Sequence, residues 1–271
     1  MRNCLNLTML ASCCVLTFTA CNQHIYVPNT VNEPLLKEKH EFKGSVSPSN
    51  FQTAFALTDH IGVMANGQYV YDFLDSGNDD GGSDVIVDSD TRGGVIEGAI
   101  GYFTPLDSKK RMVFDVYAGY GRGSFKTLSD DYTSSTNRVI NDYLLRTYFN
   151  KYFIQPGIGL SHPVIEAAFT SRLSLVKFNN LYAGAKAFET DSSRRANYMS
   201  IGNKVQPFYE PAFTFRVGYK YVKFQMQLMF SVPLNDSKYG GYDIDDYFQP
   251  VALNMGVSVN IAHWYDDWKK K

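Results

Sequence analysis

Cysteine is scarce in this chain, and three of its four cysteines lie near the N-terminus. Cys4, Cys13 and Cys14 precede residue 20, so Cys21 is the one thiol in the remainder of the sequence. A single thiol cannot form an internal disulfide, and structural zinc sites need four ligands rich in cysteine and histidine. These numbers exclude a disulfide-stabilised scaffold and a cysteine zinc site.

Long apolar runs are also missing, apart from a short one at the N-terminus. A positively charged start precedes a largely apolar run over residues 5–20, which is shorter than the roughly 20 residues of a membrane-spanning helix and predicts an export signal. A cut after Ala20 would leave bulky Phe18 where signal peptidase needs a small residue, whereas Cys21 suits lipoprotein processing. We expect residues 1–20 to be a lipoprotein signal peptide and Cys21 to be lipidated.

Neither sign of charge is in large excess. The whole chain has 26 basic and 27 acidic residues, and removal of residues 1–20 takes away Arg2, which leaves a net formal charge of −2. This balance argues against a nucleic-acid partner. Tryptophan occurs only twice, whereas 19 tyrosines and 19 phenylalanines favour β structure.

Residues 21–40 contain Pro28 and Pro34 and no sustained hydrophobic period, which predicts a lipidated tether. From residue 41 onward apolar and polar residues alternate. Val251, Leu253 and Met255, for example, are interleaved with small or polar residues. This period of two is typical of β-strands.

Ten strands are expected in the alternating region, and the gaps between them alternate between short and long. The expected strands are 41–47, 50–57, 60–73, 92–104, 110–126, 146–160, 165–180, 207–219, 222–233 and 249–262. Outer-membrane barrels have short periplasmic turns and long outer loops. The pattern predicts an all-β fold, a closed antiparallel up-and-down transmembrane barrel of about ten strands (eight to ten) over residues 41–262, followed by a C-terminal tail at 263–271. Fusion of the first two strands would leave nine.

Several segments form a recognisable set: Cys21, then Tyr26-Val-Pro-Asn29 followed by Asn32 and Pro34-Leu-Leu-Lys-Glu-Lys39, then Thr58-Asp-His-Ile-Gly-Val-Met-Ala-Asn-Gly67. With these segments the chain resembles small outer-membrane β-barrel lipoproteins of the Bacteroidota type, which share the architecture of the OmpA and OmpX barrels. The resemblance implies a membrane barrel and says almost nothing about activity. The chain departs from the usual terminal aromatic residue, because Trp264-Tyr-Asp-Asp-Trp-Lys-Lys-Lys271 follows the last expected strand.

If the apolar registers face lipid, the polar registers face the lumen. The inward set then includes Asp115, Arg172, Glu210 and Arg216, with charges of both signs. Side chains can largely fill a barrel of this size, so a paired polar plug is expected. A narrow ion path or a pocket for a small ligand is the alternative.

The expected loop before residue 92 is rich in aspartate. Asp75, Asp79, Asp80 and Asp84 lie among glycine and serine, which predicts a solvated acidic loop. Binding of Ca²⁺ or of cations that bridge lipopolysaccharide is the alternative, although the loop does not match an EF-hand. No other metal or cofactor is expected.

None of the five histidines lies at a predicted outer rim: His60 and His162 fall at expected periplasmic turns, and the others lie in the tether or after the last strand. We therefore expect a non-enzymatic outer-membrane lipoprotein, anchored through Cys21 on the periplasmic side, with a structural or surface-interaction role. Its expected partners are membrane lipid, lipopolysaccharide and a surface partner of the outer loops. The alternatives are a lipid-anchored periplasmic β-domain that binds an apolar ligand, and a rim-active hydrolase.

Overall fold

The structure is a computed structural model that describes residues 23–71, 91–129, 131–132, 139–219, 221–235, 238–239 and 241–261. This part of the chain is β structure with one α-helix, α2 (Ser192–Ser200), and the short 3-10 helices η1 (Ile140–Asp142), η2 (Ile201–Asn203) and η3 (Ile244–Tyr247). No helix within these ranges is both long and apolar enough to span a bilayer.

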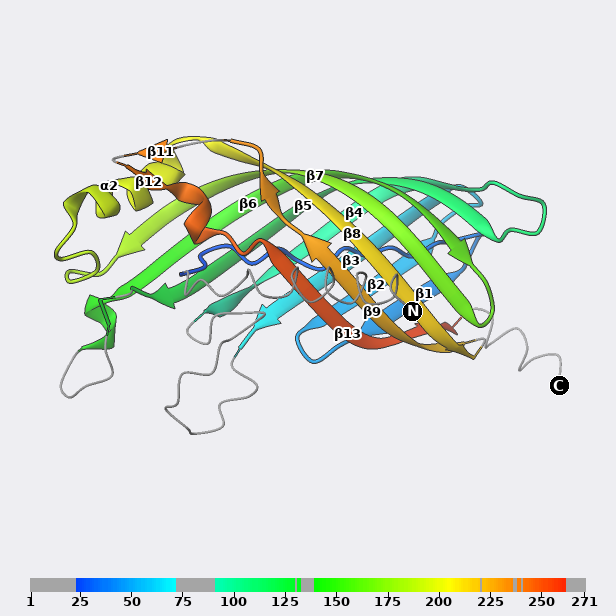
Figure 1. Cartoon of the computed structure of the whole chain (residues 1–271). Helices are drawn as coiled ribbons and strands as arrows, with labels where there is room; N and C mark the ends of the chain where they lie inside the picture. The colour runs from blue at the N-terminus through cyan, green and yellow to red at the C-terminus, as the bar shows by residue number, and fades with distance from the viewer. Residues whose placement is uncertain are drawn as a thin grey trace, which may run out of the picture.

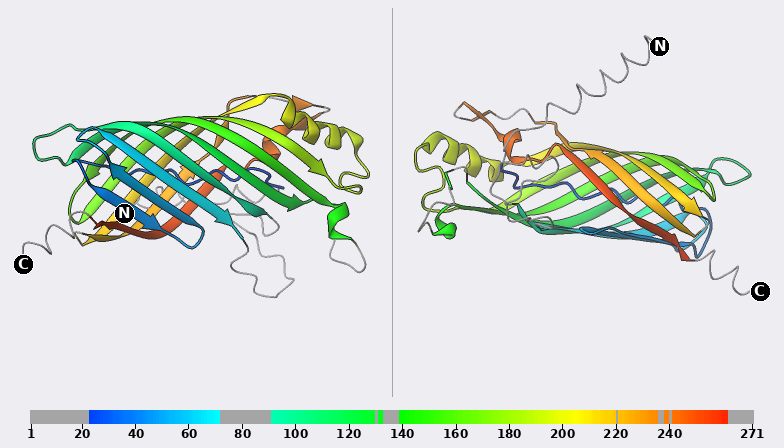
Figure 2. Two further views of the ribbon diagram at one scale, coloured as in Figure 1. Left: turned by 180° about the vertical axis from the view of Figure 1, so that it is seen from behind. Right: turned by 60° about the horizontal axis from the view of Figure 1, so that its bottom comes forward.

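Ten antiparallel strands form a closed barrel (Figures 1 and 2). The strands are β1 (Phe42–Val46), β2 (Asn50–Ala56), β3 (Ile61–Val70), β4 (Arg92–Pro105), β5 (Met112–Leu128), β6 (Leu144–Ser161), β7 (Ile165–Ala183), β8 (Val205–Tyr219), β9 (Val222–Phe230) and β13 (Val251–Asn260). Neighbours in sequence pair from β1 to β9, and β13 pairs with both β9 and β1. The prediction of a closed up-and-down barrel is confirmed, and β1 and β2 remain separate strands.

The two ends of the barrel differ in their connections. Tight turns follow β2, β4, β6 and β8, and we call this the short-turn end. The opposite end carries α2, η1, η3 and the small hairpin of β11 (Lys238–Tyr239) and β12 (Tyr242–Asp243), and we call it the long-loop end (Figure 1). Near it, β10 (Val232–Pro233) extends the pairing of β8.

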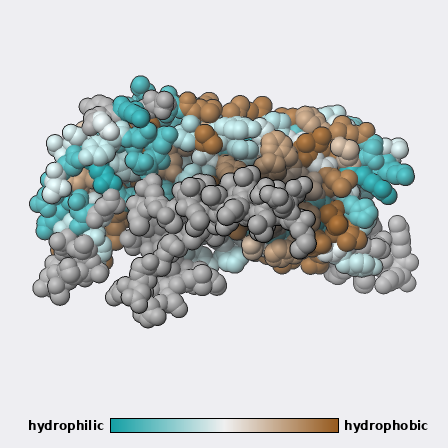
Figure 3. All heavy atoms as spheres, in the orientation of Figure 1, coloured by the Kyte–Doolittle hydropathy of each residue, from teal (hydrophilic) through white to brown (hydrophobic). Residues whose placement is uncertain are grey.

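Alternation along the strands separates an apolar outer face from a polar inner face. On β4, Ile96 is 61% exposed whereas its neighbour Glu97 is 2% exposed, and on β6, Tyr152 is 62% exposed whereas Lys151 is fully buried. Figure 3 shows hydrophobic residues along the upper edge and to the right of the centre of the visible face, and hydrophilic residues at both ends. This arrangement is the reverse of a water-soluble barrel, which places its large apolar side chains inside.

The lumen is occupied by residues 23–36, which we call the lumen segment. Ile25, Val31 and Leu35 are fully buried, and the segment runs inside the barrel along its length (blue in Figure 1). Residues 23–36, which belong to the stretch predicted as a lipidated tether at 21–40, are thus packed inside the barrel. Backbone hydrogen bonds join its start to residues 247–249, and farther along its backbone groups bond to side chains of the wall.

Candidate functional site in the barrel lumen

Side chains of the wall provide the hydrogen-bond partners of the lumen segment. Gln227 on β9 accepts a hydrogen bond from the N–H of Val31 at 2.8 Å and donates one to its carbonyl oxygen at 2.7 Å. Gln155 on β6 donates to the carbonyl oxygen of Asn32 at 2.7 Å. Buried backbone groups without partners are costly, so these inward amides stabilise the segment in an extended, non-strand path.

Two cations of the wall hold the segment closer to the short-turn end. Arg216 on β8 donates from Nη2 to the carbonyl oxygen of Glu33 at 2.7 Å, and Lys43 on β1 donates from Nζ to that of Leu35 at 2.8 Å. Hydrogen bonds with a charged partner stabilise by about 1.5–3 kcal/mol each, more than neutral ones. The lumen segment is thus fastened along most of its length.

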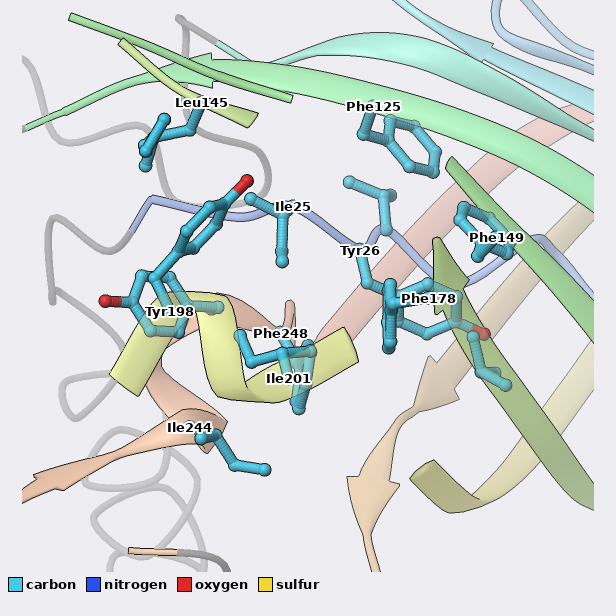
Figure 4. Close-up of a cluster of buried hydrophobic side chains, with 14 of the residues drawn as sticks. Ile25, Tyr26, Phe125, Leu145, Phe149, Phe178, Tyr198, Ile201, Ile244 and Phe248 are labelled. Atoms are coloured by element: carbon cyan, nitrogen blue, oxygen red, sulfur yellow. The ribbon is translucent and has the colours of Figure 1, made fainter. Parts of the chain in front are cut away.

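Aromatic side chains close the lumen at the long-loop end (Figure 4). The ring of Tyr26 lies with its centroid between 4.9 and 6.4 Å from those of Phe149, Phe178, Phe208 and Phe248. All five side chains are buried. Because three of them come from β6, β7 and β8, one aromatic residue of the lumen segment joins three strands of the wall to the chain that leads into β13.

A charged cluster lies beneath this aromatic layer. The ammonium of Lys151 is 2.8 Å from a carboxylate oxygen of Glu210 and 3.3 Å from one of Glu97, and Arg172 contacts Glu97 at 3.2 Å. Tyr26 donates its hydroxyl proton to Glu210 at 2.6 Å and accepts from Lys151 at 3.0 Å. Two cations and two carboxylates are therefore paired out of contact with water.

A second charged cluster lies closer to the short-turn end. Glu166 on β7 is 2.8 Å from Lys223, 3.2 Å from Arg216 and 3.8 Å from Lys43. Glu41 adds another carboxylate, 3.6 Å from Lys43. Buried charges need partners of opposite sign, and here each cation has at least one.

Two carboxyl groups meet between these clusters. Glu33 of the lumen segment and Asp115 on β5 lie side by side against Gly157, and Thr170 donates to Glu33. One oxygen of Glu33 and both carboxyl oxygens of Asp115 have no hydrogen-bond partner among the described residues. Glycine at position 157 leaves the required space, because a Cβ there would clash with both carboxyl groups. Two ionised carboxylates side by side in a buried site repel each other, so we infer that the pair holds one proton.

The charges buried in the barrel come close to balance with that proton included. The buried carboxyl groups of the described residues are Glu33, Glu41, Glu97, Asp115, Glu166 and Glu210, and the buried cations are Lys43, Lys151, Arg172, Arg216 and Lys223. Six acids with one shared proton match five cations. Neutrality suits a polar interior that is excluded from solvent.

All four residues predicted to line the lumen are buried within it, at three different places. Arg172 and Glu210 belong to the cluster around Lys151, Arg216 to the cluster around Glu166, and Asp115 to the carboxyl pair. The sequence analysis did not single out five partners: Glu97, Lys151, Glu166, Lys43 and Lys223. All five lie on the inward register of expected strands, so the alternation of apolar and polar residues could have identified them as lumen residues.

The remaining predicted sites lie outside the described residues. These are the lipidation site Cys21 and the acidic loop with Asp75, Asp79, Asp80 and Asp84. Within the described ranges, no group of three or more His, Cys, Asp or Glu side chains is placed to hold a metal ion.

The histidines near the short-turn end form structural contacts. His60 Nδ1 lies 3.2 Å from the carbonyl oxygen of Phe103, and His162 Nδ1 accepts from the N–H of Val164 at 3.3 Å. Ser161 donates its hydroxyl to Glu166 at 3.1 Å. The neighbours Ser161 and His162 thus have different partners and do not form a nucleophile–base pair with each other.

The path of the lumen segment shows at which end of the barrel its first residues, those closest to Cys21 in sequence, lie. Its first residues lie at the long-loop end, where Ile25 donates to the carbonyl oxygen of Tyr247 at 2.9 Å and His24 accepts from Thr91 at 3.2 Å. Its continuation reaches the short-turn end, where Lys39 donates to Asp59 at 3.2 Å. Gln23, two residues after Cys21, is thus at the end opposite to the one expected for a periplasmic anchor.

Helix α2 covers part of the long-loop end and is capped by Asp191. The carboxylate accepts from the backbone N–H groups of Ser193 and Arg194, each at 3.0 Å, and from the hydroxyl of Tyr242. The hydrogen bond from Tyr242, followed by those from the backbone, holds the pKa of Asp191 below its ordinary value. The cap joins α2 to the β11–β12 hairpin.

Comparison with protein-family models gives no match for this chain, and neither does comparison with curated proteins.

Proposed function

We propose that this chain is a non-enzymatic outer-membrane β-barrel lipoprotein with a structural or surface-interaction role, closed by its own N-terminal segment. The observation that carries the proposal is the combination of an apolar outer face with a polar, filled lumen. Strands β4 to β7 have 14 to 19 residues, more than the roughly 9–11 that cross a bilayer. In water, so many exposed apolar side chains would promote aggregation.

The filled lumen argues against the alternative of a carrier for an apolar ligand. A cavity beside Pro34 and Lys43 has a volume of about 10 Å³, which is space for one water molecule at most. Around the middle of the lumen segment the side chains of the wall include the amides Gln155 and Gln227 and the cation Arg216, whereas ligand pockets are mostly apolar. The same filling argues against an open ion path.

We further propose that the lipid on Cys21 and the long loops are on the same side of the membrane. Gln23 lies two positions after Cys21, and an extended chain spans at most about 3.6 Å per residue, so the two residues are at most about 7 Å apart. The anchor is then close to the long-loop end. With outward-facing long loops, the protein would be a surface-anchored lipoprotein whose chain passes inward through its own barrel.

The proposal is tested by topology in intact cells. An epitope inserted near Gly81 should be reached by antibody and external protease, whereas one inserted near Ser108 should be protected. A shift in gel migration between unboiled and boiled samples should accompany insertion into the membrane. Accessibility of neither epitope, with no migration shift, would overturn the membrane proposal.

The side of the anchor has a separate test. The mature chain, produced without acylation, carries Cys21 as its sole thiol and can be labelled there with a nitrobenzoxadiazole dye and inserted into vesicles. External dithionite should quench the dye in the same fraction of molecules whose Gly81 epitope is cleaved by external protease. Quenching in the complementary fraction would place the anchor at the short-turn end.

A further inference from the structure

All charged side chains on the outer face of the described barrel strands are basic. They are Arg92, Arg122, Lys126, Arg146 and Lys177. All five are near the long-loop ends of β4 to β7, and every carboxylate of these described strands points inward. A mixed surface would carry both signs, so this distribution indicates an anionic environment at one level of the wall.

Four of these cations form a continuous area, which we call the wall patch: Arg122, Lys126, Arg146 and Lys177. Arg122 is opposite Asn150, which is opposite Lys177, and Lys126 is directly opposite Arg146. Arg122 and Asn150 also line a hollow of about 270 Å³ together with Tyr148, Asn179 and Asn180. The wall patch thus combines cations with amides around a surface depression.

The wall patch has no internal counter-charge in the part of the chain that the structure describes. Arg122, Lys126 and Arg146 form no ion pair there, and Lys177 donates to the carbonyl oxygen of Gly202 at 2.7 Å. Like charges directly opposite on neighbouring strands destabilise a sheet, as with Lys126 and Arg146. An external anion would remove this repulsion.

The apolar surface begins one outward position away from the wall patch. Tyr120, Tyr152 and Leu175 occupy that position on β5, β6 and β7 and are 44%, 62% and 53% exposed. The hydroxyl of Tyr120 donates to Asn150 at 2.7 Å, so it faces the polar side. Such a step from apolar to aromatic to basic surface matches the boundary between acyl chains and headgroups.

We propose that the wall patch binds the phosphorylated headgroup of a glycolipid in the outer leaflet, whose acyl chains lie along Tyr152 and Leu175. Cations spread over three strands fit more than one phosphate, and the amides around the hollow fit sugar hydroxyls. This inference rests on the proposed function, because it requires the long-loop end to be at the outer leaflet.

The test is native mass spectrometry of the full mature protein in a neutral detergent, titrated with diphosphoryl lipid A. Arg122→Gln with Lys126→Gln removes one arginine and one lysine from the wall patch. Lys109→Gln with Arg111→Gln removes the same charges from the exposed turn at the short-turn end and is the matched control. We expect the first double variant to bind about thirtyfold more weakly and the control to bind like the parent, since two interfacial cations of about 1 kcal/mol each are removed.

Dephosphorylated lipid A and inorganic phosphate serve as comparison probes. The parent should bind dephosphorylated lipid A as weakly as the wall-patch variant binds lipid A, and inorganic phosphate should not compete at millimolar concentration. Equal binding by the two double variants, or equal binding of both lipids, would overturn the proposal. If the gel migration shift and vesicle insertion persist in that case, the membrane barrel stands and only the glycolipid site fails.

Discussion

The inner and outer faces of the wall are built from the same strands, yet their charged side chains differ in burial and in pairing. Inside, Lys151 and Arg172 are paired with carboxylates and excluded from water. Outside, Arg122 and Lys126 are exposed and have no carboxylate beside them on the strands. Charged groups inside this barrel thus hold the chain together, whereas those outside are available to the surroundings.

The largest loss of stability should come from replacing an arginine of an inner ion pair, with replacement of an outer arginine as the control. Arg172→Gln leaves Glu97 buried with fewer partners and should lower the free energy of unfolding by about 3–5 kcal/mol. Arg122→Gln makes the same chemical change on the outer face and should change it by about 0.5 kcal/mol or less. Urea unfolding in detergent micelles measures both, and equal losses would contradict the distinction between the faces.

The next effect concerns the tyrosine that joins the lumen segment to the charged cluster. Tyr26→Phe keeps the ring among its aromatic neighbours but removes the hydroxyl between Glu210 and Lys151, and should cost about 1–3 kcal/mol. Tyr152→Phe removes an exposed hydroxyl on the same barrel and should be nearly neutral. The same unfolding assay applies, and a neutral Tyr26→Phe variant would show that packing alone holds the segment.

Replacing one acid of the carboxyl pair should change the stability less, because we infer that the pair already holds a proton. Asp115→Asn supplies an amide donor to Glu33 in place of that proton and should change the free energy of unfolding by about 1 kcal/mol or less. Glu210→Gln, by contrast, removes the nearest carboxylate from Lys151 and should cost about 3 kcal/mol or more. If Asp115→Asn were as costly as Glu210→Gln, both carboxyl groups would have to be ionised partners of cations.

The smallest effect should be the acid sensitivity of the α2 cap. The pKa of Asp191 is lowered in the folded state, so its stabilisation is present above the ordinary value of about 3.9 and is lost as the pH falls through the lower folded value. A dye attached to Met199→Cys in a Cys21→Ser background should lose anisotropy below about pH 3.9. The Asp191→Asn variant should lack this transition; an unchanged transition would assign it to another group.

Much of the barrel was predictable because its signal is local. The alternation in β13, with Leu253 and Met255 outward and Asn254 inward, depends only on neighbouring residues and the two-residue period of a strand. The same alternation identified Asp115, Arg172, Glu210 and Arg216 as inward residues. Their partners could not be assigned, because Arg172 and Glu97 are 75 positions apart in sequence and meet only when the barrel closes.

The lumen segment was not predictable for a different reason. Its prolines and irregular pattern are those of a tether, and nothing local distinguishes a polar stretch in water from one surrounded by amides. Gln227 and Val31, which exchange two hydrogen bonds, are separated by 196 positions. The sequence predicted no strand in this segment, and the structure has none there, but the sequence did not predict that the segment lies inside the barrel.

The strands and the apolar side of each strand can be inferred without a structure, because both follow from steric and hydrophobic preferences over a few residues. The pairing of the charges, the chain that fills the lumen and the end at which residue 23 emerges are visible only in the closed barrel. Those features depend on closure of β13 against β1, which brings distant inward side chains around a common axis and leaves the lumen segment as the partner that satisfies them.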